Sequence, residues 1–212
     1  MGYPVELNLE GKKCLVVGGG STASRKVTGL LQASANVTVV SPELDEQLRR
    51  LFLDKSITWI EQPFHPSQLE GMYLVVAAAL KREINLEVAR EAHARGILVS
   101  AVGFRNQSDF WQPAVLRRGD LCIAVSSGGK SAVLANRVRM EIERRFGPEY
   151  GDLLTLLSNI RSQALPMQLD ARTQIDLQNI LYDDAEIRDL LRQKRMAEAV
   201  ARARSILKKL GH

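Results

Sequence analysis

The segment from Lys13 to Val40 limits the fold more than any other part of the chain. An apolar run, Lys13–Val17, leads into Gly18-Gly19-Gly20, and a β-branched run, Val37–Val40, closes the segment. Between them, apolar residues from Ala23 to Leu31 recur at the spacing of one helical face. A strand, a glycine turn, a helix and a second strand within about 28 residues match the length of a βαβ unit. This part of the chain therefore predicts a parallel α/β sheet.

The alternation of strand and helix patterns continues as far as residue 102. The expected elements are a helix over 44–53, strands over 57–60 and 74–78, a helix over 82–95 and a strand over 97–102. The run 74–78 is apolar throughout, which is typical of a parallel strand with both faces covered. This order predicts the fold class, an α/β, Rossmann-like, doubly wound parallel sheet.

The pattern changes after Pro113. A strand is expected over 121–125 and a polar glycine turn over 126–131, and every later segment has a helical pattern. The expected helices span 132–146, 153–165, 171–182 and 184–210. The second half is therefore predicted to be a mainly helical tail.

The glycine turn after the first strand is the strongest chemical signal. Segment 17–23 fits the pattern GxGxx(G/A) between a predicted strand and a predicted helix. Gly18 permits the tight turn, Gly20 lets a pyrophosphate approach the backbone, and Ala23 lets the helix pack closely on the strand. The amides and the dipole at the start of the helix favour an anion. The alternative is a glycine-rich turn that holds no ligand.

The acidic residue that usually binds the ribose is missing from the end of the second predicted strand. Ser41-Pro42-Glu43 follow Val40 there. Either Glu43, displaced past the turn, or Ser41 is left to contact the ribose. No arginine stands beside that strand end to hold a 2′-phosphate, which favours NAD over NADP.

A second glycine turn, Ser126–Ser131, has two interpretations. It resembles a phosphate cradle whose amides and Lys130 would take an anionic group of a ligand, although the P-loop spacing is absent. It is equally a loop that opens a helix with Ser131 as the N-cap.

Several function classes lack support in the sequence. The three histidines, His65, His93 and His212, have no metal-ligand spacing, so no metal site is predicted. Aromatic residues do not interleave with basic ones as they do in many nucleic-acid-binding proteins. No apolar run approaches the roughly 20 residues of a membrane span, and the two cysteines form no CxxC motif. We expect no nucleic-acid partner, no membrane partner and a cytoplasmic location.

The net charge of +5 lies entirely in the second half. Residues 1–112 hold 12 basic and 12 acidic side chains, whereas residues 113–212 hold 17 and 12. This asymmetry indicates either a polyanionic partner or ordinary solubility charge.

Taken in order, the motifs resemble the N-terminal family of siroheme synthases, which comprises precorrin-2 dehydrogenases, some of them also sirohydrochlorin ferrochelatases. The resemblance covers residues 3–210. The motifs that carry it are Tyr3-Pro4, Val16-Val17-Gly18-Gly19-Gly20, Ala23-Ser24-Arg25-Lys26, Val37–Pro42, Phe110-Trp111-Gln112-Pro113-Ala114, Ser126–Ser131 and Val133-Leu134-Ala135.

The resemblance implies three regions: an NAD-binding Rossmann-like domain (1–112), a dimerisation segment (113–148) and a C-terminal helical domain (149–212). It also implies a homodimer and a tetrapyrrole substrate, precorrin-2, which is oxidised to sirohydrochlorin with NAD as the cofactor. Bifunctional members of the family then insert iron.

Two departures from the family pattern bear on activity. Ala78-Ala79-Leu80-Lys81 stands where the family reads A-T-D-D, and Gly103 stands where it has its candidate catalytic aspartate. Asp109, six residues further on, is the nearest replacement carboxylate. Two hypotheses follow. The chain is an NAD-dependent precorrin-2 dehydrogenase with a rearranged site, or it is a non-catalytic carrier or sensor of a tetrapyrrole. A chelatase without dehydrogenase activity is a third alternative.

The candidate site residues divide by role. Asp109 is the candidate catalytic residue. The candidate cofactor-binding residues are Gly18, Gly20, Ser21, Thr22, Ala23, Ser41, Pro42, Glu43, Ala78 and Ala79. The candidate substrate-binding residues are Gly103, Arg117, Ser126, Ser127, Gly128, Lys130 and Arg137. Neutralising the basic residues is expected to weaken tetrapyrrole binding more than dinucleotide binding; these are Arg117, Arg118, Lys130 and Arg137.

Overall fold

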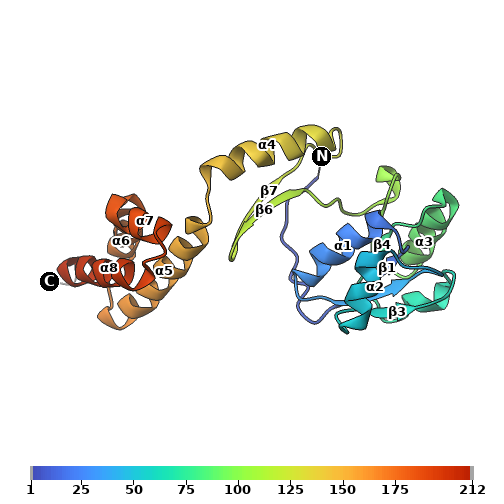
Figure 1. Ribbon diagram of the computed structural model, residues 1–212, viewed down its shortest axis with the longest axis horizontal. Helices are drawn as coiled ribbons and strands as arrows, with labels where there is room; N and C mark the ends of the chain where they lie inside the picture. Colours follow the sequence, from blue (N-terminus) through green and yellow to red (C-terminus); the bar gives the residue numbers. More distant parts are fainter. Residues whose placement is uncertain (1, 211–212) are drawn as a thin grey trace. The chain divides into compact units, whose positions relative to one another are not determined.

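The computed structural model describes residues 2–210 and divides the chain between Gln112 and Pro113 into two units (Figure 1). The first unit contains a parallel sheet of five strands in the order β3-β2-β1-β4-β5. Its strands are β1 (Lys13–Val17), β2 (Asn36–Val40), β3 (Thr58–Ile60), β4 (Leu74–Ala77) and β5 (Leu98–Ala101). The predicted α/β, Rossmann-like fold class is confirmed.

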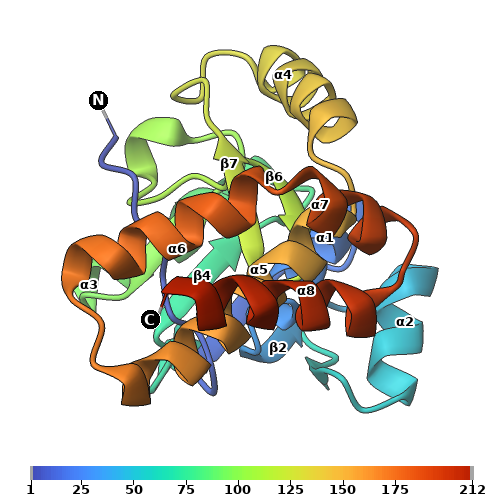
Figure 2. The same cartoon turned by 90° about the vertical axis from the view of Figure 1, so that its left-hand side faces the viewer.

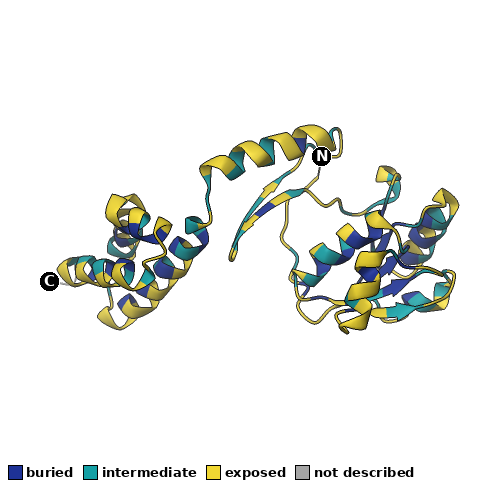
Figure 3. Ribbon diagram, viewed as in Figure 1, coloured by how far each residue is buried: buried dark blue, intermediate teal, exposed yellow. Residues whose placement is uncertain are grey.

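Helices cover both faces of this sheet. Helices α1 (Ser21–Leu31) and α2 (Glu46–Leu53) pack on one face, and α3 (Arg82–Ala94) packs on the other. The side chains of β1 alternate between the two cores, with Val16 in the first and Val17 in the second. Figure 3 shows the resulting pattern, in which the strands and the inward faces of the helices are buried. Burial on both faces explains why these strands are apolar runs.

The register of the strands brings four loops to one edge of the sheet. Val17 at the end of β1 is aligned with Val40 in β2 and with Ala77 in β4, and Ala77 is aligned with Ala101 in β5. We call this side the carboxyl edge. The strand order reverses between β1 and β4, and open parallel sheets bind ligands at such a reversal.

The second unit begins with an antiparallel hairpin that the sequence reveals only in part. Strands β6 (Ala114–Arg118) and β7 (Leu121–Val125) pair with each other and are joined by Gly119-Asp120. Gly119 has a positive φ of 56°, which a tight two-residue turn requires. The expected strand over 121–125 is correct, but β6 was not expected. Its apolar run has only three residues, Ala114–Leu116, and two arginines follow it, so it is too short to mark a buried strand.

Five helices follow the hairpin, and the last four form a bundle with its own core. They are α4 (Ala132–Arg145), α5 (Glu149–Ala164), α6 (Ala171–Asp183), α7 (Ala185–Arg192) and α8 (Met196–Leu210). Figure 2 shows α5 to α8 from their own side. Leu156, Ile160, Leu181 and Ile187 are fully buried among them. A single helix over 184–210 was expected, and this expectation was wrong because Lys194, with a φ of 61°, separates α7 from α8.

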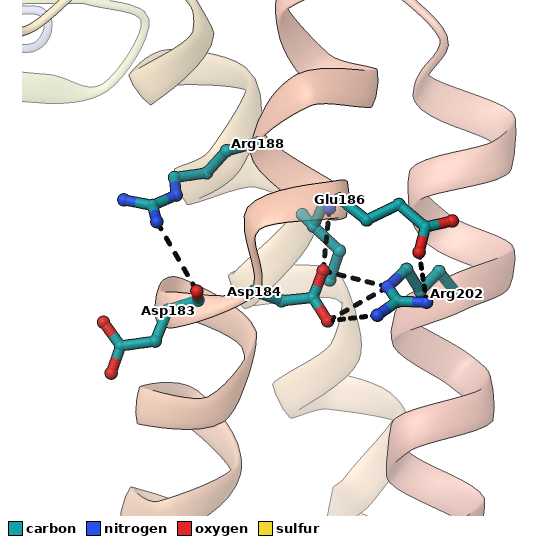
Figure 4. A network of polar contacts seen from close by, with 6 residues as sticks. Asp183, Asp184, Glu186, Arg188 and Arg202 are labelled. Atoms are coloured by element: carbon teal, nitrogen blue, oxygen red, sulfur yellow. Dashed lines mark hydrogen bonds and ion pairs between the residues drawn. The ribbon is translucent and has the colours of Figure 1, made fainter.

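A charged network fixes the turn between α6 and α7. Asp184 caps α7 by accepting a hydrogen bond from the Ile187 N–H at 2.8 Å. Its carboxylate also accepts hydrogen bonds from the guanidinium of Arg202 in α8 at 2.8–3.0 Å (Figure 4). Arg202 also pairs with Glu186 at 2.5 Å. The hydrogen bond from Arg202 holds the pKa of Asp184 below its usual value. The ion pairs of Arg202 with Asp184 and Glu186 therefore help to hold α8 against α7.

Candidate functional site

The glycine loop after β1 is held between the ends of two neighbouring strands. The Gly18 N–H donates to the Val40 carbonyl at 2.8 Å, and Gly18 has a φ of 125°. A Cβ atom on Gly18 would overlap the Ala78 carbonyl. Only glycine fits this backbone and this close approach. Gly18 is therefore required by the loop itself, as the motif predicts.

Gly19 packs against the loop that follows β2. A Cβ atom there would overlap the Glu43 carbonyl and lie 2.6 Å from Ser41 Oγ. The Gly19 carbonyl accepts from the Asp45 N–H at 2.7 Å. The sequence assigned no role to Gly19, yet it is the most tightly enclosed glycine of the loop.

Gly20 faces the other way, toward open space. It is exposed, and a Cβ atom on it would meet nothing within 4 Å. Gly20 is the N-cap of α1 and provides no side chain to cap the helix, and the first turn contains no acidic residue. The first N–H groups of a helix lack intrahelical acceptors, so the amides of Ser21 and Thr22 are available to an anion. The open backbone and the uncapped helix start fit the pyrophosphate of a dinucleotide.

The residues after β2 are fixed beside this loop. The Ser41 carbonyl accepts from Trp59 Nε1 at 2.9 Å, and the Ser41 N–H donates to the Ile60 carbonyl at 3.3 Å. Ser41 Oγ faces Gly19, whereas Pro42 and the Glu43 side chain are exposed. Both candidates for ribose contact, Ser41 and Glu43, thus lie next to the glycine loop.

Asp45 performs a structural task that the sequence analysis missed. Its carboxylate accepts from the buried Ser24 hydroxyl at 2.7–2.8 Å and from the Leu48 N–H at 2.8 Å. It therefore caps α2 and ties α2 to α1. An aspartate three residues before the apolar Leu48 is an N-cap signal, but the link to Ser24 follows only from the fold.

A buried asparagine holds the loop after β4. Asn85 is 2% exposed, its Oδ1 accepts from the Ala79 N–H at 2.8 Å, and its Nδ2 donates to the Ala79 carbonyl at 3.0 Å. Ala78 is buried beside Gly18 across the strand reversal. Sequence reasoning missed Asn85, because an asparagine on a helical face carries no mark of its distant partner.

The loop after β5 contains a glycine in a left-handed conformation. Gly103 is exposed and has a φ of 83°, and the nearest atom to an added Cβ is Arg82 Nη1 at 3.9 Å. The Arg82 guanidinium lies over the Phe104 ring at 4.6 Å from its centroid. The position that holds an aspartate in the family pattern is therefore next to a cation.

Asp109 lies beside β5 and not beyond its end. Its backbone N–H donates to the Val99 carbonyl at 2.8 Å, and one carboxylate oxygen accepts from the Val99 N–H at 2.9 Å. The other oxygen is 3.2 Å from His93 Nε2. Val99 is the second residue of β5, so Asp109 extends the edge of the sheet before the strand ends. These contacts give Asp109 a structural task, and its catalytic role stays a prediction.

The second glycine turn, in the second unit, is organised by its own serines. Ser126 Oγ accepts from the Gly128 N–H at 3.1 Å, and Ser127 Oγ accepts from the Ser131 N–H at 3.0 Å. Ser131 caps α4 by accepting from the Leu134 N–H at 3.1 Å, as one interpretation of the sequence predicts. The hydroxyls of Ser126 and Ser127 thus stabilise the turn, and that of Ser131 caps the helix.

The basic candidates of the second unit differ in how free they are. Arg117, Lys130 and Arg137 are exposed. Arg118 instead donates to the Phe146 carbonyl at 3.0 Å and pairs with Glu143, whose pKa is lowered mainly by its hydrogen bond with Arg139. Arg118 therefore joins the hairpin to the end of α4 and is the least available of the four to a ligand.

Some kinds of site have no counterpart within residues 2–210. No group of three or more His, Cys, Asp or Glu side chains there could hold a metal ion. No helix in the same range is both long and apolar enough to cross a lipid bilayer. Cys14 is buried, which raises the pKa of its thiol to about 11, whereas Cys122 is only half-buried.

The first unit, with its open glycine loop at the strand reversal, is a dinucleotide-binding α/β domain. Residues 5–114 match the family described as putative NAD(P)-binding, and the chain belongs to this family. Residues 118–145 match a second family, described as the central part of sirohaem biosynthesis proteins. The resemblance to the siroheme synthase family is thus confirmed.

Individual relatives point the same way. The chain is 42% identical to a siroheme synthase of Methylobacillus flagellatus over 158 residues, which are 74% of this chain and 34% of the relative. It is 34% identical to a siroheme synthase of Psychromonas ingrahamii over 198 residues, which are 93% of this chain and 42% of the relative. The chain therefore spans between a third and a half of the length of these relatives.

A solved structure has the same fold. The chain named "SirC, precorrin-2 dehydrogenase" superposes with a TM-score of 0.74 at 23% identity, covering 94% of this chain and 99% of that one. This likeness supports the architecture along nearly the whole sequence.

Proposed function

We propose that this chain oxidises precorrin-2 to sirohydrochlorin and uses NAD as the hydride acceptor. One observation carries the proposal: an NAD(P)-binding domain is followed directly by a segment that matches sirohaem biosynthesis proteins. The names of the relatives, siroheme synthases and a precorrin-2 dehydrogenase, agree with this step.

The carboxyl edge of the sheet offers a place for each part of the dinucleotide. The backbone of Gly20 and the amides of Ser21 and Thr22 would hold the pyrophosphate, because they are open and begin a helix. Ser41 or Glu43 would contact the ribose. The cofactor, when bound, supplies the acceptor for two electrons and one proton as a hydride.

The reaction also releases a proton. Precorrin-2 loses a hydride to NAD and a proton, giving sirohydrochlorin, NADH and H⁺. A positioned base contributes about 10²–10⁴-fold to such a step. Holding the macrocycle against the nicotinamide contributes separately. With Gly103 in place of a carboxylate, we propose that the proton leaves to water and that positioning carries most of the rate.

The second unit is proposed to form a homodimer and to bind the tetrapyrrole. Val133, Leu134 and Met140 of α4 are 71%, 57% and 48% exposed, which leaves an apolar surface on this helix. We propose that a second copy covers it, and that Arg117, Lys130, Arg137 and the turn 126–128 bind carboxylates of the tetrapyrrole.

Both cysteines are free, in keeping with a reducing cytoplasm.

Anaerobic turnover tests the proposal. Precorrin-2 is supplied with and without NAD, and the absorbance of sirohydrochlorin and NADH is followed. We expect equal amounts of both products, formed only with NAD and faster than without protein. Tight binding of sirohydrochlorin without turnover would instead favour a carrier or sensor. Light scattering on the same sample tests the dimer, and Val133→Glu is expected to give a monomer.

A further inference from the structure

Arg82 is held at the carboxyl edge between the ends of two neighbouring strands. It is the first residue of α3, in the connection that follows β4, and its guanidinium lies over Phe104, which follows β5. Its Nη1 atom is 3.9 Å from the position that a Cβ of Gly103 would take. Because β4 and β5 are paired in the sheet, Arg82 lies beside Gly103, the position where the family pattern has its candidate catalytic aspartate.

The charge of Arg82 has no ionic partner in the part of the chain that the structure describes. Among residues 2–210, no salt bridge or side-chain hydrogen bond involves Arg82, whereas Arg118 and Arg202 are each paired with carboxylates. Glu83 is adjacent in sequence, but neighbouring residues on a helix do not face each other. Asp109 is occupied by His93 and Val99. An exposed arginine without a partner is available to an anion that arrives from outside.

The aromatic ring orients this free charge. The contact with the Phe104 ring uses the face of the ring and none of the N–H groups of Arg82, which have no acceptor among the described residues. The edge of the guanidinium plane matches a carboxylate, which arginine binds through two parallel hydrogen bonds. Gly103 keeps the adjacent space open, and Leu80, which is fully exposed in the same connection, offers an apolar contact.

We infer that Arg82 binds a carboxylate of the substrate and thereby positions the macrocycle. The inference rests on the proposed function, because it requires a substrate that carries carboxylates. A phosphate of the dinucleotide is the other anion within this domain. The groups that suit the phosphates lie at Gly20 and the start of α1, after β1, whereas Arg82 lies on the β4–β5 side of the strand reversal. The substrate is therefore the better match.

Binding measurements on the full chain test the inference. The variants are Arg82→Gln, Phe104→Leu and, as the matched control, Arg90→Gln, because Arg90 is an exposed arginine on the same helix. The probes are sirohydrochlorin, its methyl ester and NAD, each titrated anaerobically. We expect Arg82→Gln to weaken sirohydrochlorin binding about tenfold or more. Phe104→Leu should weaken it less, and Arg90→Gln should leave it unchanged.

The other readouts separate this role from a structural one. NAD affinity should change less than twofold in Arg82→Gln, the methyl ester should not distinguish this variant from wild type, and KM for precorrin-2 should rise more than kcat falls. Equal sirohydrochlorin affinity in Arg82→Gln and wild type would overturn the inference, and so would a loss of NAD affinity instead.

The proposed function fails separately. If the wild type binds NAD and sirohydrochlorin without turnover, the dehydrogenase proposal is wrong, while a tenfold loss in Arg82→Gln still supports carboxylate binding. If the wild type does not bind sirohydrochlorin, both are overturned.

Discussion

The two halves of the carboxyl edge are built in opposite ways. On the β1–β2 side, Gly19 is enclosed and Asp45 is paired with Ser24, while Gly20 and the start of α1 stay open. On the β4–β5 side, Gly103 is open and Arg82 has no ionic partner within residues 2–210. The first half is held by close backbone contacts, and the second leaves space beside Gly103. A substitution is therefore expected to disturb the fold more in the first half than in the second.

The largest expected effect on stability comes from adding a side chain at Gly19, on the β1–β2 side. Gly19→Ala places a methyl group on the Glu43 carbonyl, so the two loops must separate. We expect a loss of about 3 kcal/mol in the free energy of unfolding of the first unit, together with loss of NAD binding. Urea denaturation followed by tryptophan fluorescence measures it, because Trp59 and Trp111 both lie in this unit.

Gly20→Ala is the matched control for this prediction. Its methyl group enters open space, so the stability loss should stay below about 1 kcal/mol. NAD affinity should still fall, because the methyl group stands where the pyrophosphate approaches. Equal stability losses in the two variants would mean that the loops are not packed as described.

A smaller effect is expected where the open half is anchored. Asn85→Ala leaves the N–H and the carbonyl of Ala79 without their partners. We expect a loss of about 2 kcal/mol in the free energy of unfolding. Asn106→Ala, at an exposed position, is the control and should be neutral. If Asn85→Ala were equally neutral, the loop after β4 would not depend on this side chain.

The sequence predicts the elements of the first unit well for a physical reason. Buried parallel strands are short apolar runs. The run 74–78 and the glycine turn after β1 can therefore be recognised from adjacent residues alone. Strand β6 and the break at Lys194 lack such marks. Two of the five residues of the strand are arginines, and a lysine at positive φ is not a residue type that signals a break.

The candidate site is only partly predictable for the same reason. Gly18 and Gly20 follow from a motif of adjacent residues. The pairs Ser24–Asp45 and Asn85–Ala79 and the stacking of Arg82 on Phe104 depend on how the loops meet, so the sequence pattern did not reveal them. Because Arg82 lies next to Gly103, an aspartate introduced at that position would face a cation.

The effect on kcat of restoring a carboxylate at position 103 should depend on whether Arg82 is present. In Gly103→Asp, the new side chain starts 3.9 Å from Arg82 Nη1, within reach of an ion pair. We therefore expect kcat for precorrin-2 oxidation to change less than threefold in this variant. The double variant Gly103→Asp/Arg82→Gln frees the carboxylate and should raise kcat about tenfold, which is less than the roughly 10²–10⁴-fold that a fully positioned base contributes.

Comparison of kcat, rather than KM, is essential here, because Arg82→Gln is itself expected to weaken substrate binding. Arg82→Gln alone serves as the control. A full gain in the single variant Gly103→Asp would mean that Arg82 does not neutralise the new carboxylate.

The smallest effect is expected at Asp109. Both of its carboxylate oxygens are engaged, with the Val99 N–H and with His93, at a point before β5 ends. Asp109→Asn keeps the shape but offers one oxygen instead of two, so we expect a stability loss of about 1 kcal/mol and a change in kcat below threefold. A loss of kcat of a hundredfold with unchanged stability would make Asp109 the base and would place the chemistry nearer to the β5 edge. His93→Gln separates the two cases, since it disturbs the structural pair without removing the carboxylate.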